Sequence, residues 1–248
     1  PAKAARRVPS QRLAVLREHS SHHTKMDQSA VLDDDALIQL LQEHGNNQAE
    51  GLSSSVPLSA RTIAIGWLRD INGEFTPCDP DIFPAACSYF DRFSAAVPVA
   101  KGRIQLLAAT SLLLASKQSG VQTAYYSIED LVWFCDGLYT ASDILALEFQ
   151  VICALSWEMR PCQPHFIAEQ LVSRMHSLRA EETQEIKSMA TSLIDLCYSD
   201  ALLACFSQGV MAEACLQAAV HTLCKQRKLI ALEDNVNSVF GTLSYFSR

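Results

Sequence analysis

The sequence predicts an all-α protein built as two tandem helical bundles. Its 248 residues are long for one bundle and suit two bundles of roughly 100 residues each. Apolar residues recur at helical spacing along most of the chain, and the Val/Ile-rich alternation typical of strands is missing. Hydrophobic residues make up 49% of the chain and charged residues 19%, which is enough apolar material for two buried cores.

The first half contains a short amphipathic segment followed by five further helical patterns. The segment VLDDDALIQLLQEH opens with acidic residues, which suit a helix N-terminus, and the polar linker GNNQAEGLSSS follows it. The breaks between the later patterns are rich in Gly, Pro, Asp and Ser, the residues typical of turns. We expect helices at about 57–73, 80–95, 101–118, 127–136 and 141–156.

The break RPCQP at 160–164 divides the chain, and four more helical patterns follow it. In each half the third helix, LLAATSLLLASK or GVMAEACLQAAVHTLC, consists mostly of small apolar residues, as expected for the central helix of a bundle. The chain ends after the fourth pattern, so the sequence leaves open whether the second bundle has its last helix. We expect helices at about 164–178, 181–199, 208–225 and 232–246, and three regions: a basic head at 1–29, a first bundle with its preceding helix at 30–158, and a second bundle at 159–248.

Charge is distributed unevenly, and the distribution argues against a nucleic-acid partner. Residues 1–25 carry six Lys or Arg against one acid, Glu18, whereas the rest of the chain carries 14 basic and 26 acidic residues. Binding to duplex DNA needs Lys and Arg against the phosphates, and the body has an excess of acids. The basic head is either a nuclear address or a solvated tail, and we favour the tail. The longest apolar run, 104–116, is too short for a membrane span, and no signal peptide is recognisable, so no membrane association is expected.

The nine cysteines and the missing catalytic motifs predict a reduced protein without a cofactor. The cysteines are scattered, none forms C-x-x-C, and most lie in apolar helical patterns, which is typical of an intracellular protein without disulfides. Zinc-ligand spacing is missing, and the cluster His19, His22 and His23 lies in a polar stretch. No phosphate-binding loop, dinucleotide fingerprint or nucleophile elbow is present. We therefore expect no metal, no cofactor and no enzymatic activity.

Four charged residues interrupt apolar helical patterns. They are Arg61, Asp91, Lys117 and Glu148. Burying such groups unpaired is costly, so each should have a partner. For Arg61 and Asp91 we favour an internal ion pair that fixes helix packing, and for Lys117 and Glu148 a surface that faces another protein. Internal pairing remains the alternative for the second two.

Together these segments resemble the cyclin family. Cyclins have an Arg that opens the first helix of the box, an Asp in Y-x-D-R-F, a Leu and a Lys on the third helix, and a Glu on the fifth. The segments FPAACSYFDRF, LEFQVICALSWEMRPCQPHFI and LCYSDALLACFSQGVMAEACLQAAV are closer still to D-type (G1) cyclins. The ordered set in this chain is Arg61, Asp91, Leu106, Lys117 and Glu148.

The resemblance implies a cyclin fold and a non-catalytic regulatory subunit that forms a heterodimer with a cyclin-dependent kinase. Lys117 and Glu148 would form the polar centre of the kinase-facing surface, and Ile152 would extend it. Arg61 and Asp91 would pair inside the first bundle, and Leu106 would lie in its core. The implied partner is a kinase that pairs with D-type cyclins, the implied substrates are pocket proteins, and the implied location is the nucleus and cytoplasm.

This chain departs from the family pattern at its substrate-docking patch. Where cyclins have M-R-A-I-L-x-x-W, the chain has ARTIAIGW, so Arg61, Ile63 and Trp67 remain of a degenerate patch. The L-x-C-x-E motif of D-type cyclins is not found in this sequence. A second interpretation is therefore a cyclin-fold adaptor or scaffold in transcription or signalling that does not activate a kinase. A DNA-bridging adaptor would be expected to have a basic face, which the acidic body disfavours.

Overall fold

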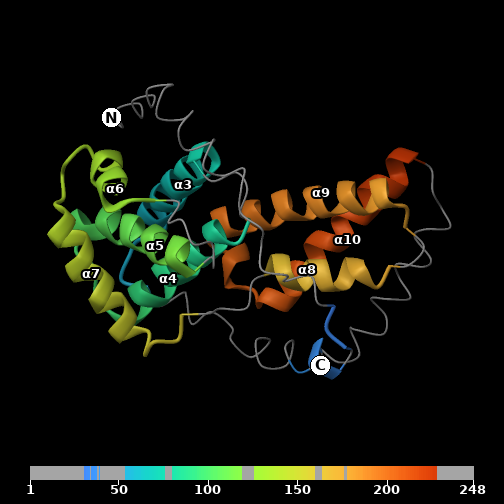
Figure 1. Cartoon of the computed structure of the whole chain (residues 1–248), viewed down its shortest axis with the longest axis horizontal. Coiled ribbons are helices and arrows are strands. Elements are labelled where there is room, and N and C mark those ends of the chain that lie inside the picture. Colours follow the sequence, from blue (N-terminus) through green and yellow to red (C-terminus); the bar gives the residue numbers. More distant parts are fainter. Residues whose placement is uncertain are drawn as a thin grey trace.

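The computed structural model describes residues 31–33, 35–37, 39, 54–75, 80–118, 126–159, 164–175 and 178–227. Within these ranges every regular element is a helix (Figure 1), which confirms the all-α class. No described helix is long and apolar enough to cross a membrane. The basic head, half of the segment before the linker and the predicted helix at 232–246 lie outside the described residues. The α-helices are α3 (Leu58–Phe75), α4 (Ile82–Ala96), α5 (Ile104–Gln118), α6 (Ile128–Phe134), α7 (Ala141–Ala154), α8 (Pro164–Ser173), α9 (Ala180–Ser199) and α10 (Gln208–Arg227), with 3-10 turns η2 (Lys101–Arg103) and η3 (Leu203–Cys205).

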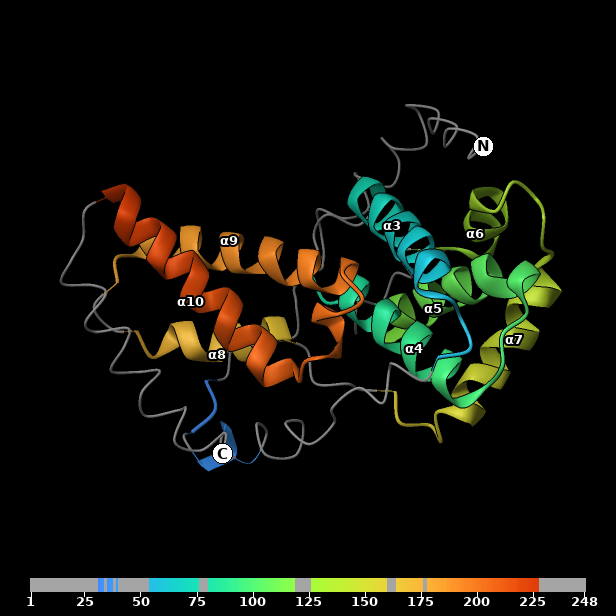
Figure 2. The ribbon, with the colours of Figure 1, turned by 180° about the vertical axis from the view of Figure 1, so that it is seen from behind.

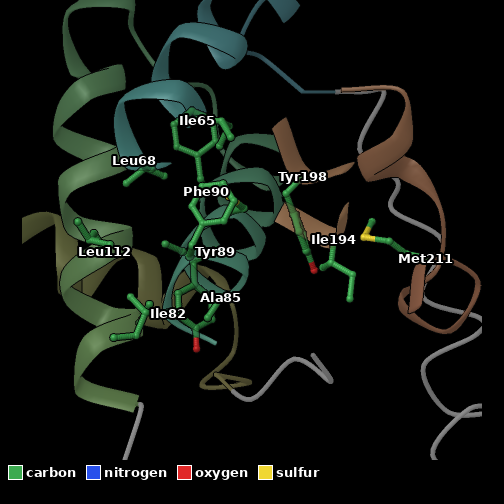
Figure 3. Packing of buried hydrophobic residues seen from close by; sticks show 14 of the residues in the cluster. Ile65, Leu68, Ile82, Ala85, Tyr89, Phe90, Leu112, Ile194, Tyr198 and Met211 are labelled. Carbon is green, nitrogen blue, oxygen red and sulfur yellow. The ribbon is translucent and has the colours of Figure 1, made fainter. Parts of the chain in front are cut away.

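Helix α5 is the centre of the first bundle. It packs against α3, α4, α6 and α7, and its residues from Leu106 to Ser116 are all buried because Ala, Ser and Leu allow close approach from every direction. Figure 3 shows Leu112 of α5 facing Leu68 of α3 and Tyr89 of α4. Leu106 also lies in this core. Helix α6 is shorter than expected because Asp136 and Gly137 adopt positive φ angles, 54° and 67°, which end the helix.

Helices α8, α9 and α10 pack on one another beyond the first bundle (Figure 2). Helix α10 buries a broad face, whereas Ala214, Gln217 and Ala218 on its other side are exposed. Among the described residues, α10 is therefore covered by α8 and α9 on one face, and its expected position at the centre of a bundle stays a prediction. The domain boundaries at 29/30 and 158/159 stay a prediction.

The two bundles meet along α9. Phe83 of α4 packs edge-on against Tyr198 of α9, with ring centroids 6.4 Å apart. In Figure 3, Tyr198 lies between Phe90 of the first bundle and Met211 of the second. Arg69 of α3 donates a hydrogen bond to the hydroxyl of Ser199, 3.2 Å away. Apolar packing and polar contacts thus join the bundles across the same stretch of α9.

A capping box begins α7. The backbone N–H of Asp143 donates to the Thr140 hydroxyl oxygen (3.2 Å), and the Asp143 carboxylate accepts from the Thr140 backbone N–H (2.8 Å). These bonds satisfy donors that the first turn of a helix leaves without partners. They fix where α7 starts and therefore which of its residues face the core.

Thr140→Ala is expected to lower the free energy of unfolding by about 1 kcal/mol, because the cap is lost. Urea unfolding should show a lower midpoint with an unchanged slope. The matched control is Thr62→Ala, which removes a hydroxyl from the exposed side of the second turn of α3 and should cost nothing, since alanine is the better helix former. Equal midpoints for the two variants would contradict the cap's contribution.

Candidate partner-binding site

Lys117 and Glu148 form an ion pair with each other. The Lys117 Nζ lies 2.5 Å from the Glu148 Oε1. The Glu148 side chain is 11% exposed and the Lys117 side chain 45%, so the carboxylate lies under the ammonium at the edge of the core. The structure thus pairs two residues that were each expected to need a partner. The pair lies at the surface, with Lys117 open to solvent.

Two helices position this pair. Lys117 lies in the last turn of α5, where a cation interacts favourably with the helix dipole. Glu148 belongs to the buried stripe of α7, which also contains Ile144, Leu147 and Val151 and packs against α5. A carboxylate in such a stripe needs a cation from a neighbouring helix, and the end of α5 supplies it.

Exposed apolar side chains lie beside Glu148 on α7. Leu145, Phe149 and Ile152 are spaced four and three residues apart, so they form a second stripe next to the buried one. Phe149 is 63% exposed, Leu145 is also exposed, and Ile152 is partly buried against the core. We call Lys117, Leu145, Glu148, Phe149 and Ile152 the α7 surface. A sequence signal for it existed, because α7 is apolar on more sides than one core contact requires.

Trp157 extends the apolar exposure beyond the end of α7. It is 70% exposed and has a φ of 64°, a conformation that bulky side chains rarely adopt. Its backbone N–H donates to the carbonyl of Ile152 (3.0 Å), which closes the turn. Arg92 of α4 holds the next residue, because its guanidinium donates to the Glu158 carbonyl at 2.9 Å. Neither Phe149 nor Trp157 was expected from the sequence to be a site residue.

Arg61 and Asp91 lie away from this surface, inside the first bundle. Arg61 Nε and Nη2 donate to the two carboxylate oxygens of Asp91, each at 2.8 Å. Arg61 Nη2 also donates to the carbonyl of Tyr198 at 3.2 Å, so the side chain reaches into the second bundle. Helices α3 and α4, which both contact α9, are therefore linked to it through one guanidinium.

The remnants of the docking pattern do not share one exposed face. Arg61 is buried, Ile63 is 74% exposed, and Trp67 is partly buried against the core. The structure therefore places Arg61 in the interior and Ile63 at the surface. Within the described ranges, no group of three or more His, Cys, Asp or Glu residues could hold a metal ion.

The α7 surface has the composition of a protein contact. Aromatic side chains exposed together with aliphatic ones are typical of interface centres, and an exposed apolar cluster on a small protein marks an interaction site. The ion pair would fix the orientation of a partner on this surface more than it would tighten binding.

The sequence of this chain is similar to a known family model and to curated proteins. Residues 37–160 match the family model described as "Cyclin, N-terminal domain". G1/S-specific cyclin-D1 of Homo sapiens is 30% identical over 188 residues, which are 76% of this chain and 59% of that protein. The chain thus spans about three fifths of the length of that curated relative.

Two solved structures have a similar fold. A viral cyclin from herpesvirus saimiri superposes with a TM-score of 0.67 at 18% identity, covering 85% of this chain and 95% of that one. A chain of the CAK complex from Chaetomium thermophilum, bound to ATP-gamma-S, gives a TM-score of 0.51 at 16% identity, covering 93% and 78%. At these identities the likeness extends to the fold.

Proposed function

The chain belongs to the cyclin family, and we propose that it binds and activates a cyclin-dependent Ser/Thr protein kinase as a non-catalytic subunit. The observation that carries the proposal is the α7 surface. Its charged pair, Lys117 and Glu148, has exposed Phe149 and Leu145 beside it. Both charged residues occupy the positions that the family resemblance assigns to kinase contact.

The exposure pattern supports a contact rather than a purely internal role. An internal ion pair would stabilise α5 against α7 without needing Phe149 in water. Leaving that ring in water gives up roughly 2 kcal/mol of hydrophobic stabilisation, and contact with a docked partner would recover it. The exposed half of the Lys117 side chain could then donate to backbone carbonyls of the kinase.

Activation would follow as a population shift. Phosphoryl transfer needs the kinase's own Lys–Glu ion pair, which forms when the kinase C-helix lies inward. A rigid surface that contacts this helix only in its inward position favours the active arrangement by the difference in the two binding free energies. The capping box at Thr140 and the packing of α7 on α5 support this role, because both hold the helix in place.

We further propose that the kinase is one that pairs with D-type cyclins and that the complex acts on pocket-protein substrates in G1 control. The similarity to cyclin-D1 supports this choice. Substrate docking would differ from that of cyclins with the full docking motif, because Ala60 and Ala64 replace larger residues.

The test is to mix the purified chain with a D-type-partner kinase and to measure binding and phosphate transfer to a pocket-protein fragment. The Lys117→Ala/Glu148→Ala double variant should lose both activities. The matched control is Glu169→Ala/Lys187→Ala, which removes an ion pair of the same residue types from the second bundle. It should behave like the unmodified chain.

A second comparison isolates the apolar part of the α7 surface. Phe149→Ala should weaken kinase binding by about tenfold or more, as expected for an interface aromatic, and Phe206→Ala should not. Both rings are exposed, so neither change should unfold the protein. Binding without activation would indicate a scaffolding cyclin. Absence of binding to any such kinase would favour the adaptor interpretation.

A further inference from the structure

Two cysteines from neighbouring helices of the second bundle lie in direct contact. The sulfur of Cys197 on α9 is 3.6 Å from the sulfur of Cys215 on α10, and both residues are free thiols. Cys197 is partly exposed, whereas Cys215 is buried. The pair thus combines a sulfur that solvent can reach with a second sulfur directly behind it.

The distance is short enough for a bond to form without rearrangement of the helices. A disulfide has sulfurs about 2.05 Å apart, so each sulfur would need to move by less than about 1 Å, which side-chain rotation supplies. Helices α9 and α10 pack together over much of their length, which keeps the two sulfurs facing each other. The sequence pattern gave no sign of this pair, since 18 residues separate the two cysteines.

We propose that Cys197 and Cys215 are a redox modification site, which a hydroperoxide converts into a disulfide that joins α9 to α10. Cys197 is the attacking residue, because it is the more exposed of the two. Cys215 is the resolving residue. Burial raises the pKa of the Cys215 thiol to about 12, so it keeps its proton until Cys197 has reacted.

The reaction balances with hydrogen peroxide as the oxidant. The Cys197 sulfur attacks one peroxide oxygen, the O–O bond breaks, and one water leaves as the sulfur becomes a sulfenic acid. The Cys215 sulfur then attacks the Cys197 sulfur, its proton leaves with the hydroxyl group, and a second water is released. Two thiols and one peroxide thus give one disulfide and two waters.

The first experiment locates the bond. The full chain is treated with hydrogen peroxide, its remaining thiols are alkylated, and it is digested without reduction for mass spectrometry. Trypsin alone is insufficient, because no Lys or Arg lies between Lys187 and Lys225. An Asp/Glu-specific protease used together with trypsin also cleaves at Asp195, Asp200 and Glu213, which puts the two cysteines on separate peptides. We expect peptide 196–200 joined to peptide 214–225, with fragmentation distinguishing Cys215 from Cys224 and thiol reductant separating the two.

Variants and heat stability supply independent readings. Cys215→Ser should leave Cys197 as a sulfenic acid that a cyclic diketone probe labels, and Cys197→Ser should leave Cys215 reduced. Oxidation of the unmodified chain should raise Tm by about 5–10 °C, and a thiol reductant should reverse the rise. The Cys197→Ser/Cys215→Ser double variant should show no rise. Recovery of Cys197 as an alkylated thiol, as a sulfinic acid, or joined to a cysteine other than Cys215 would overturn the proposal.

Discussion

Replacing Arg61 with alanine is expected to lower the free energy of unfolding by about 3–5 kcal/mol. Arg61 is 7% exposed, holds both carboxylate oxygens of Asp91 and donates to the carbonyl of Tyr198. Truncation leaves the Asp91 charge in a mostly apolar setting and removes a donor at the junction of the bundles. Chemical denaturation followed by tryptophan fluorescence measures the loss.

The controls for Arg61 separate the pair from a general effect of removing a cation. Arg92→Ala removes a partly exposed arginine whose partner, Glu158, is exposed and 3.5 Å away, and it should cost less than about 1 kcal/mol. A double variant, Arg61→Leu with Asp91→Leu, should be more stable than Arg61→Ala, because it leaves no charge unpaired. A loss for Arg61→Ala no larger than that for Arg92→Ala would show that this ion pair does not stabilise the junction.

Helix positions could be predicted because the pattern that specifies them is local. The apolar run of α5 and the turn residues around α7 lie within a few residues of what they determine. The family resemblance similarly indicated the Arg61–Asp91 pair, and the structure forms it. The end of α8, expected at 178 and found at Ser173, differs most from its prediction, since the residues that end a helix leave a weaker pattern than those inside it.

Contacts between distant residues could not be predicted in the same way. Lys117 and Glu148 are 31 residues apart, and periodicity shows only that each needs a partner, not that they meet. Phe149 and Trp157 escaped notice because an apolar residue in a helical pattern is taken as core. Their exposure depends on which faces the other helices cover. The contact between Cys197 and Cys215 depends in the same way on how α9 and α10 pack.

A buried histidine and a carboxylate lie together in the second bundle, and their pKa values shift in opposite directions. His165 of α8 and Asp195 of α9 have Nε2 and Oδ1 3.6 Å apart. Burial lowers the pKa of His165 to about 4. Burial raises the pKa of Asp195 to about 7, which the charge of Arg69 offsets in part. Between about pH 4 and 7 the folded pair therefore holds one proton, wherever that proton resides.

The unfolded chain also holds one proton on these two residues over most of that range. In the unfolded chain the two side chains have their ordinary pKa values, 6.5 for the histidine and 3.8 for the aspartate. Stability depends on pH only where the folded and unfolded states bind different numbers of protons. The two shifts therefore nearly cancel, and the pair contributes little pH dependence in the unmodified protein.

Removing either side chain of the pair should make the pKa shift of the other visible as a pH dependence of stability. In Asp195→Asn the lowered pKa of His165 remains, so stability is full above about pH 6.5 and is lost as pH falls through 4, by up to about 3 kcal/mol. In His165→Gln the raised pKa of Asp195 remains, so stability is full below about pH 3.8 and is lost as pH rises through 7. Urea unfolding of both variants from about pH 4.5 to 7.5, relative to the unmodified chain, should give slopes of opposite sign. Parallel profiles would mean that burial does not shift these two pKa values.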